Sequence, residues 1–369
     1  MNEGSTQLCE LTINGQPLVA LPEAPAKSEA RGVDGLITRR LKVMHDIFAP
    51  RVTARGVPFE FVLEVTARCN LLCPMCPRSV PNYMDAVPDQ DMDMDTFHRV
   101  LDRVRDVATL VWFTGRGEPM MNKHFMRMIR EFREAGVAVG VSTNGTFLTP
   151  KQQERILDTG LDYLIVSFDG ADKETFEKIR IGADFEKVRD NVRSFAALKI
   201  ARKMKDPWLV LQMIEMAPNR GQDQAFKKLW NLPGIDAVRI KDEQLQFDKS
   251  MTFEGQRKRL GKKPCMNLWR GTPMVQWDGT MLPCCFGPAD KAFGNLKHAG
   301  LDELWNSSRI KDLRASHLAG CGLTEDYCKN CNAIEPGKLL LAASAVLPIL
   351  WQKKNNHHVE QLNRWVRFL

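Results

Sequence analysis

The stretch that decides the fold is FVLEVTARCNLLCPMC, residues 61–76. Its first part, 61–66, is apolar and β-prone, and its second part brings Cys69, Cys73 and Cys76 together in the spacing C-x3-C-x2-C. The sequence therefore predicts a strand followed by a loop that carries three thiolates. Three thiolates can ligate three irons of a four-iron cluster and leave the fourth iron open to a small molecule. Short cysteine spacings also serve tetrahedral zinc, which is the alternative that this motif leaves open.

This loop resembles that of the radical S-adenosylmethionine (SAM) superfamily, in which C-x3-C-x2-C follows the first strand of a barrel. The resemblance implies that the three cysteines hold a 4Fe-4S cluster whose open iron binds the amino and carboxylate groups of SAM. That family usually has an aromatic residue before the third cysteine, where it contacts adenine. Met75 stands there in this chain, and its polarizable thioether can also pack against a ring.

Short apolar runs alternate with amphipathic segments after the cysteine loop. The predicted strands are 110–113, 138–142, 163–168, 208–213 and 237–240, and the predicted helices are 94–107, 123–135, 151–157, 185–198 and 224–230. Such alternation predicts a parallel sheet of the α/β class. With the strand before the cysteines, the six strands predict a partial (β/α)6 barrel, similar to a TIM barrel, which is also the architecture of the resembled family.

Polar segments follow the predicted strands, at the end of a parallel barrel where active sites gather. The resemblance implies that TGRGEP (114–119) holds the amino group of SAM, with Glu118 as the carboxylate. Small polar side chains after later strands suit ribose hydroxyls, although Asn-Gly and Asp-Gly also mark ordinary turns. The candidate cofactor-binding residues are Met75, Gly115, Gly117, Glu118, Pro119, Ser142, Asn144, Ser167 and Gln212. The candidate proton acceptors, among which the sequence does not choose, are Lys241, Glu215 and Asp169.

A second cysteine set begins at Cys265 and continues in WDGTMLPCC (277–285), where Asp-Gly predicts a β-hairpin with Cys284 on the returning strand. A helix is expected over 301–314. The C-x13-G-x4-C start resembles the SPASM and twitch extensions of radical SAM enzymes. The shorter twitch form implies one auxiliary 4Fe-4S cluster, ligated by Cys265, Cys284, Cys328 and Cys331. Cys285 or Cys321 could replace one of these ligands, and a structural zinc site is the alternative.

The composition describes a soluble globular protein with 44% hydrophobic and 26% charged residues. A spread net charge of +7 disfavours nucleic acid as a partner. The N-terminus lacks the features of a signal peptide, so we expect a cytoplasmic protein whose cysteines bind metal. The apolar run 339–351, with basic and aromatic flanks, suits either a packed helix or peripheral contact with the inner face of a membrane.

The expected organisation has four parts. Residues 1–57 form an N-terminal extension, 58–250 the radical SAM partial barrel, 251–335 a small twitch- or SPASM-like iron–sulfur domain, and 336–369 an apolar and basic helical tail.

The resemblance implies an enzyme that reductively cleaves SAM to a 5′-deoxyadenosyl radical, which removes a hydrogen atom from the substrate. A single auxiliary cluster favours a two-electron oxidation of a small polyol or carbohydrate, free or lipid-linked, by a radical SAM oxidoreductase. An electron donor such as flavodoxin or ferredoxin is then required. A peptide maturase, an epimerase or a carbon–carbon bond-forming enzyme would use the same machinery. The alternative outside enzymes is a zinc-stabilised binding protein.

Overall fold

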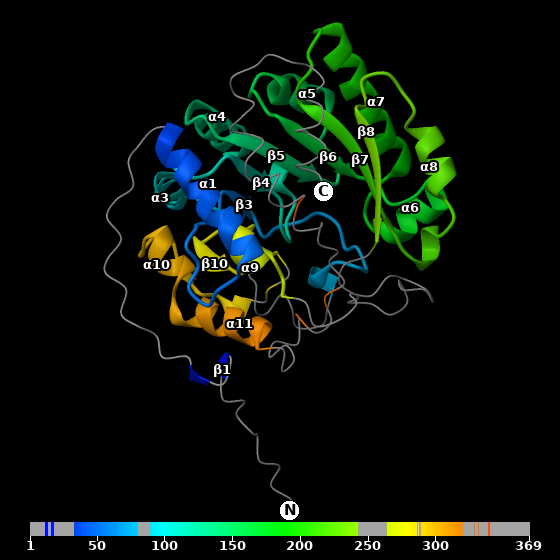
Figure 1. The fold of residues 1–369 in the computed structure, drawn as a ribbon. Coiled ribbons are helices and arrows are strands. Elements are labelled where there is room, and N and C mark those ends of the chain that lie inside the picture. Colours follow the sequence, from blue (N-terminus) through cyan, green and yellow to red (C-terminus); the bar gives the residue numbers. More distant parts are fainter. Residues whose placement is uncertain are drawn as a thin grey trace, which may run out of the picture.

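The computed structural model of the chain describes residues 12–13, 16–17, 33–79, 89–242, 264–285, 287, 289–319, 328, 331 and 339. Most of the strands form one curved sheet in the order β11–β10–β9–β3–β4–β5–β6–β7–β8 (Figure 1). Six parallel strands make its barrel part: β3 (Glu60–Leu63), β4 (Leu110–Phe113), β5 (Ala138–Thr143), β6 (Tyr163–Ser167), β7 (Trp208–Glu215) and β8 (Ala237–Asp242). The predicted partial (β/α)6 barrel is therefore confirmed.

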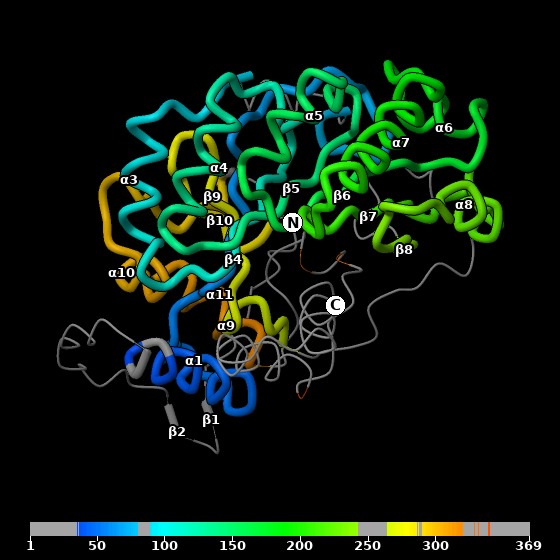
Figure 2. Tube along the Cα trace, turned by 90° about the horizontal axis from the view of Figure 1, so that it is seen from above, coloured from blue at the N-terminus to red at the C-terminus, as the bar shows by residue number. Residues whose placement is uncertain are grey.

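Helices cover the outer face of these strands (Figure 2). The five expected helices are present as α3 (Met94–Val104), α4 (Phe125–Glu134), α5 (Pro150–Leu157), α7 (Phe185–Ala201) and α8 (Asp223–Leu229). The structure adds α6 (Lys173–Ile179), which the sequence analysis did not predict. Asp172 begins this helix, since its carboxylate accepts a hydrogen bond from the backbone N–H of Thr175. Short 3-10 helices are η1 (Pro77–Ser79), η2 (Pro119–Met121), η3 (Ala217–Asn219) and η5 (Ala289–Lys291).

The two faces of the barrel strands bury different side chains because successive residues of a strand point to opposite faces. On the outer face, strand residues such as Val111, Val139 and Leu211 pack with helix residues in the main core. On the inner face, Leu110, Tyr163, Ile165, Trp208 and Val210 form a separate apolar cluster, against which Trp112, Ala138 and Ala237 also pack. This inner cluster is the floor of the barrel.

The predicted hairpin is present as β9 (Met274–Val275) and β10 (Thr280–Leu282), followed by β11 (Gly294–Asn295). It continues the barrel sheet, because β9 pairs in parallel with β3 and places Val62 opposite Met274. Cys284 lies just beyond β10 rather than on it. The short helix α9 (Asn267–Arg270) leads into the hairpin, and Arg270 pairs with Glu60 of β3 at 3.0 Å.

The N-terminal extension contains the helix α1 (Val33–Phe48), which packs closely on the barrel. Val43 and Ile47 are fully buried in the main core. The Asp46 carboxylate accepts hydrogen bonds from the backbone N–H groups of Arg55 and Gly56. The part of the N-terminal extension that holds α1 is therefore integrated into the barrel. A two-strand ladder of β1 (Thr12–Ile13) and β2 (Gln16–Pro17) precedes it.

The single helix expected over 301–314 is wrong, because the structure has α10 (Leu301–Trp305) and α11 (Ser308–Leu318) there. Asn306, between them, does not have helical backbone angles, and its side chain binds a residue far away in the sequence. Its amide oxygen accepts from the backbone N–H of Ala54, and its amide nitrogen donates to the Ala54 carbonyl. This tertiary contact ends the first helix.

The predicted boundary at 250/251 and the C-terminal tail, apart from Leu339, lie outside the described residues. Within the described part of the chain, every helix is too short or too polar to cross a lipid bilayer.

Replacing Gly140 with alanine tests the packing of the barrel floor. A Cβ atom at this position would lie 2.3 Å from the Trp112 ring. Because overpacking of a core costs about 1–3 kcal/mol, we expect Gly140→Ala to lower the free energy of unfolding by that amount. Urea unfolding followed by circular dichroism measures it. Gly300→Ala is the matched control, since its Cβ would meet nothing within 4 Å, and an equal loss in both variants would contradict the packing argument.

Candidate functional site

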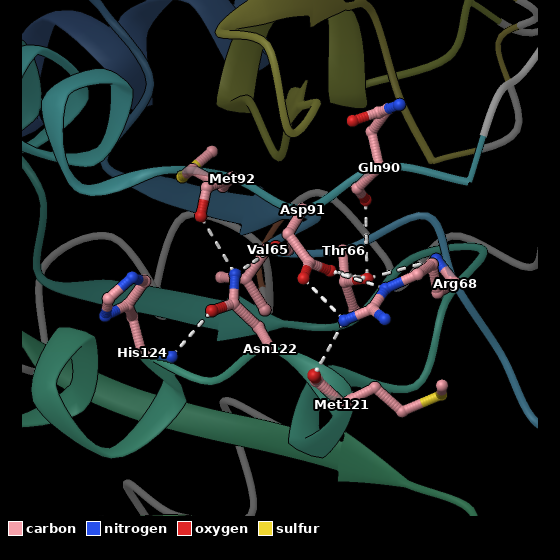
Figure 3. A network of polar contacts seen from close by, with 9 residues as sticks. All are labelled: Val65, Thr66, Arg68, Gln90, Asp91, Met92, Met121, Asn122 and His124. Carbon is pink, nitrogen blue, oxygen red and sulfur yellow. Dashed lines mark hydrogen bonds and ion pairs between the residues drawn. The ribbon is translucent and has the colours of Figure 1, made fainter.

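The loop that carries the first three cysteines is fixed to the end of β3 by a network of polar contacts (Figure 3). Arg68, directly before Cys69, donates from Nε to Asp91 at 3.0 Å and from Nη2 to the Met121 carbonyl at 3.0 Å. The Thr66 hydroxyl also donates to Asp91, at 2.6 Å. We call Thr66, Arg68 and Asp91 the loop clamp. It joins the chain directly before Cys69 to the segment that contains Asp91.

Asn122 extends the same network into the body of the protein. Its buried amide nitrogen donates to the carbonyl oxygens of Val65 and Met92, at 2.6 and 3.0 Å. The strand that leads to the cysteines is thereby joined to the segment that follows β4 (Figure 3). The Cys69 backbone consequently starts from a rigid support.

The three thiols of this loop lie close enough to influence one another. Burial raises the pKa of each thiol, and the neighbouring thiolates raise the pKa of Cys76 further, to about 11. The backbone N–H of Cys76 donates to the Cys73 carbonyl, which turns the C-x2-C pair toward one side. None of the three is in a disulfide. These three crowded thiols resist ionisation when no cation is bound to them. They are therefore a donor set that fits a positively charged iron–sulfur cluster.

Two polar side chains approach the sulfur atoms. The amide nitrogen of Asn144 lies 4.0 Å from the Cys69 sulfur, and Arg180 Nη1 lies 3.9 Å from the Cys73 sulfur. Both are donors, as thiolates require. Among the described residues, no three His, Cys, Asp or Glu side chains form a group that could hold a single metal ion.

The TGRGEP segment lies against the cysteine loop, where glycine is required. A Cβ at Gly117 would lie 2.1 Å from the Thr66 carbonyl oxygen and 2.7 Å from that of Arg68. Pro119 opens η2, and Gly115 approaches Glu64 of the chain after β3. The segment is therefore brought beside the cysteines, as expected.

Glu118 of this segment is already fully engaged with the protein. Its carboxylate accepts hydrogen bonds from the Thr143 hydroxyl, the Asn144 backbone N–H and the Met120 backbone N–H. Burial raises the pKa of this carboxyl, and those three donors act in the opposite direction. In this structure Glu118 joins the ends of β4 and β5, which places Asn144 next to the cluster cysteines.

The upper part of the barrel interior is polar. Strand alternation puts Ser142, Ser167 and Gln212 on the same face as the apolar floor, nearer to the carboxyl ends of the strands. Register places Ser167 beside Gln212 and Gln212 beside Arg239 of β8. Lys241 follows on that face of β8, beside Ile214. The structure thus brings several predicted residues together on the inner face of the sheet, along with Arg239, which the sequence analysis did not select.

The three candidate proton acceptors have different surroundings. Asp169 is fully buried, forms an ion pair with Arg180 and accepts a hydrogen bond from the Ile214 backbone N–H. Glu215 is on the opposite face of β7 from Gln212, beside Asp242, so it does not face the barrel interior. Lys241 is on the inner face of β8, and Asp169 is near enough for its charge to act on the pKa of Lys241. Its burial, and next the charge of Arg239, lower the pKa of Lys241 from 10.5 to about 8.

The second cysteine set repeats one feature of the first. The backbone N–H of Cys331 donates to the Cys328 carbonyl at 3.4 Å, as that of Cys76 does to Cys73. Cys265 and Cys328 both pack against the main core, and the Cys265 backbone N–H donates to His317 Nδ1. Cys285 is near enough to Lys241 and Cys331 for their charges to affect its pKa. Cys321 lies outside the described residues.

The sequence analysis did not predict two ion pairs of the site. Arg180 pairs with Asp169, and Arg116 pairs with the buried Glu64 at 3.2 Å. Both arginines stand in segments after barrel strands, and their position next to glycine-rich turns was the available signal. Their partners could not be inferred, because Glu64 follows a different strand from Arg116, and Asp169 and Arg180 are brought together by the folding of the connection between β6 and β7.

Comparison with known proteins gives two family matches. The model of the radical SAM superfamily matches residues 63–214, and that of an iron–sulfur cluster-binding domain, SPASM, matches residues 265–332. The tungsten-containing aldehyde ferredoxin oxidoreductase cofactor-modifying protein of Pyrococcus furiosus is 26% identical, with 73% of this chain and 86% of that protein covered. A PqqA peptide cyclase of Granulibacter bethesdensis is 23% identical, with 75% and 80% covered.

Among solved structures, Streptococcus suis SuiB bound to its precursor peptide SuiA matches with a TM-score of 0.56 and 11% identity. The match covers 75% of this chain and 70% of SuiB. At this identity the likeness concerns the fold, and it agrees with a radical SAM barrel extended by a SPASM domain.

The loop clamp is tested by Asp91→Asn, which removes the charge opposite Arg68. Because the charge-assisted contacts that hold the Cys69 backbone are weakened, we expect the bound iron to be lost to a chelator severalfold faster. Iron and sulfide per chain, measured over time after anaerobic reconstitution, report this. Asp95→Asn is the control, since Asp95 is in an exposed pair with Arg99. Equal rates of loss in both variants would exclude a role for the clamp.

Proposed function

Since the chain belongs to the radical SAM superfamily and carries a C-terminal SPASM domain, we propose that it dehydrogenates a small polyol or carbohydrate-type substrate. It is an enzyme whose cofactors are 4Fe-4S clusters and SAM. Cys69, Cys73 and Cys76 would hold the SAM-binding cluster, which when bound would supply the electron that cleaves SAM to the 5′-deoxyadenosyl radical that takes a hydrogen atom from the substrate.

The proposed oxidation balances with two further transfers. After loss of one hydrogen atom, the substrate gives one proton to Lys241 and one electron to the auxiliary cluster, for which Cys265, Cys284, Cys328 and Cys331 are the proposed ligands. The substrate thus loses two hydrogens, while 5′-deoxyadenosine carries one of them away. A one-electron donor of the flavodoxin or ferredoxin type restores the first cluster.

The position of Lys241 is the observation that carries this proposal. Its side chain is on the inner face of β8, and its lowered pKa of about 8 provides a neutral amine at mildly alkaline pH. A proton acceptor needs a pKa near the working pH. Asp169, in its ion pair, is proposed as the residue that orients Arg180 rather than as a base. Glu215 is not proposed as a base because it is on the outer face of its strand.

The remaining predicted contacts concern SAM. We propose that the TGRGEP segment, Ser142, Asn144, Ser167 and Gln212 surround it on the polar upper part of the barrel interior, with Met75 near the adenine. The apolar floor below them, which includes Tyr163 and Trp208, excludes water from the reacting centre.

A peptide substrate is the second candidate, and the relatedness to PqqA peptide cyclases over most of the chain favours it. Anaerobic incubation with SAM, dithionite and cell extract separates the two. Mass spectrometry is expected to find a small metabolite that has lost two hydrogens. A modified peptide would support the cyclase function, and an unchanged mass with solvent deuterium would support an epimerase.

The two cysteine sets are distinguished by serine variants. Reconstituted enzyme should hold about eight irons per chain, from two four-iron clusters. We expect Cys73→Ser to abolish formation of 5′-deoxyadenosine, because the cluster that reduces SAM loses a ligand. Cys328→Ser should still form 5′-deoxyadenosine but yield no oxidised product. Zinc without sulfide in the wild-type protein would refute the proposal and support the zinc-stabilised binding protein.

The role of Lys241 predicts a pH dependence. The amine accepts a proton only when neutral, so product formation at saturating substrate should rise with pH and level off above about 8. Lys241→Met should lower it by about 10²-fold or more, whereas Lys187→Met, at an exposed lysine of α7, should not. A flat pH profile together with an active Lys241→Met variant would rule out Lys241 as the base.

A further inference from the structure

We propose that the substrate of this enzyme carries an oxyanion, either a phosphate monoester or a carboxylate, and that Arg239 binds it inside the barrel. This inference rests on the proposed function, because it assigns the substrate to the barrel interior. It adds a substrate class and a specificity-determining residue.

The placement of Arg239 follows from the strand register. Ala237, Arg239 and Lys241 are on one face of β8, and Ala237 packs against the apolar floor of the barrel. Val238 and Ile240, which alternate with them, pack against the main core on the helix side. Arg239 therefore starts directly above the floor, beside Gln212 of β7, and Lys241 starts nearer to the mouth.

The carboxylates near the carboxyl ends of the barrel strands are already engaged. Glu64 pairs with Arg116, Asp169 pairs with Arg180, and Glu118 accepts three hydrogen bonds. Asp242 and Glu215 are opposite each other on the outer face of the sheet. Asp169 and Cys285 are near enough to Lys241 for their charges to act on its pKa, whereas only burial acts on the pKa of Arg239.

Arg239 and Lys241 have no ion pair or hydrogen-bonded acid in the part of the chain that the structure describes. Burial lowers the pKa of Arg239, and no nearby acid acts against it. For Lys241, the charges of Cys285 and Asp169 partly oppose the effects of burial and of Arg239 on the pKa. A guanidinium held inside a protein is costly unless an anion accompanies it. A bound ligand is the missing source of negative charge.

The chemistry of the Arg239 side chain limits which class of anion it would bind. The planar guanidinium of arginine presents parallel N–H groups that match the two oxygens of a carboxylate or phosphate. An oxyanion held at Arg239 would lie above Tyr163 and Trp208 of the floor and below Lys241. The carbon next to the anionic group would then face the amine proposed to accept its proton.

Calorimetric titration of the reconstituted, SAM-loaded enzyme with inorganic phosphate and, separately, with acetate tests the inference. We expect saturable binding at one site, weakened at least tenfold by Arg239→Gln and less strongly by Arg239→Lys, which keeps the charge but lacks the paired N–H groups. Tighter binding of phosphate would identify a phosphate monoester as the substrate, and tighter binding of acetate a carboxylate. The melting temperature of each variant shows whether it is folded.

Arg202→Gln is the matched control, because it removes the same charge from an arginine paired with Glu154 and Asp158 on the surface. It should bind both probes like the wild type. Equal weakening in Arg202→Gln and Arg239→Gln would overturn the inference. Binding that occurs only without SAM would also overturn it, since Arg239 would then serve the carboxylate of SAM itself.

The class of the natural substrate gives an independent test. The metabolite that the wild-type enzyme consumes from a cell extract should be retained by an anion-exchange resin, and a neutral metabolite would overturn the inference. Formation of 5′-deoxyadenosine in the same incubation tests the proposed function separately. Deoxyadenosine with a neutral substrate would refute only the anion site, and absence of deoxyadenosine would refute the proposed function.

Discussion

The attachment of the cysteine loop to the end of β3 is the constraint on which the rest of this structure depends. Thr66, Arg68 and Asp91 fix the start of the loop, and Gly117 lets the segment after β4 pass close to it. Three thiols that repel one another as thiolates can share a cluster only if the backbone prevents them from separating. The buried contacts of Glu118 then bring the end of β5 to the same point, so the ends of β4 and β5 meet beside this loop.

The inner face of the barrel changes from apolar to polar along the strand axis, and the two parts have different roles. Aromatic and aliphatic residues fill the floor, where they stabilise the sheet and exclude water. Polar residues follow near the carboxyl ends of the same strands, as in other parallel barrels. Several charges in this part are paired, Glu64 with Arg116 across neighbouring strands and Asp169 with Arg180 within the connection between β6 and β7. Arg239 of β8 has no such pair among the described residues.

The auxiliary cysteines belong to a region that shares the barrel sheet. The pairing of β9 with β3, together with the Arg270–Glu60 ion pair, couples the hairpin before Cys284 to the strand before Cys69. Both sets of cysteines are therefore linked to β3, the first through the chain and the second through the hairpin. A continuous sheet is a stiffer connection between the two sets of cysteines than a linker between separate domains.

The sequence by itself determined the cysteine spacing, the six barrel strands, the hairpin and the order of the polar segments, because these depend on local patterns of apolar and turn-forming residues. It did not predict α6, and it merged α10 and α11, which a contact between Asn306 and Ala54 separates. Only the tertiary structure decided that Asp169 forms an ion pair with Arg180 and that Glu215 faces outward. It also decided that Arg239 lies inside, with no acidic partner among the described residues. Ion pairing and strand register join residues far apart in the chain, so no local pattern encodes them.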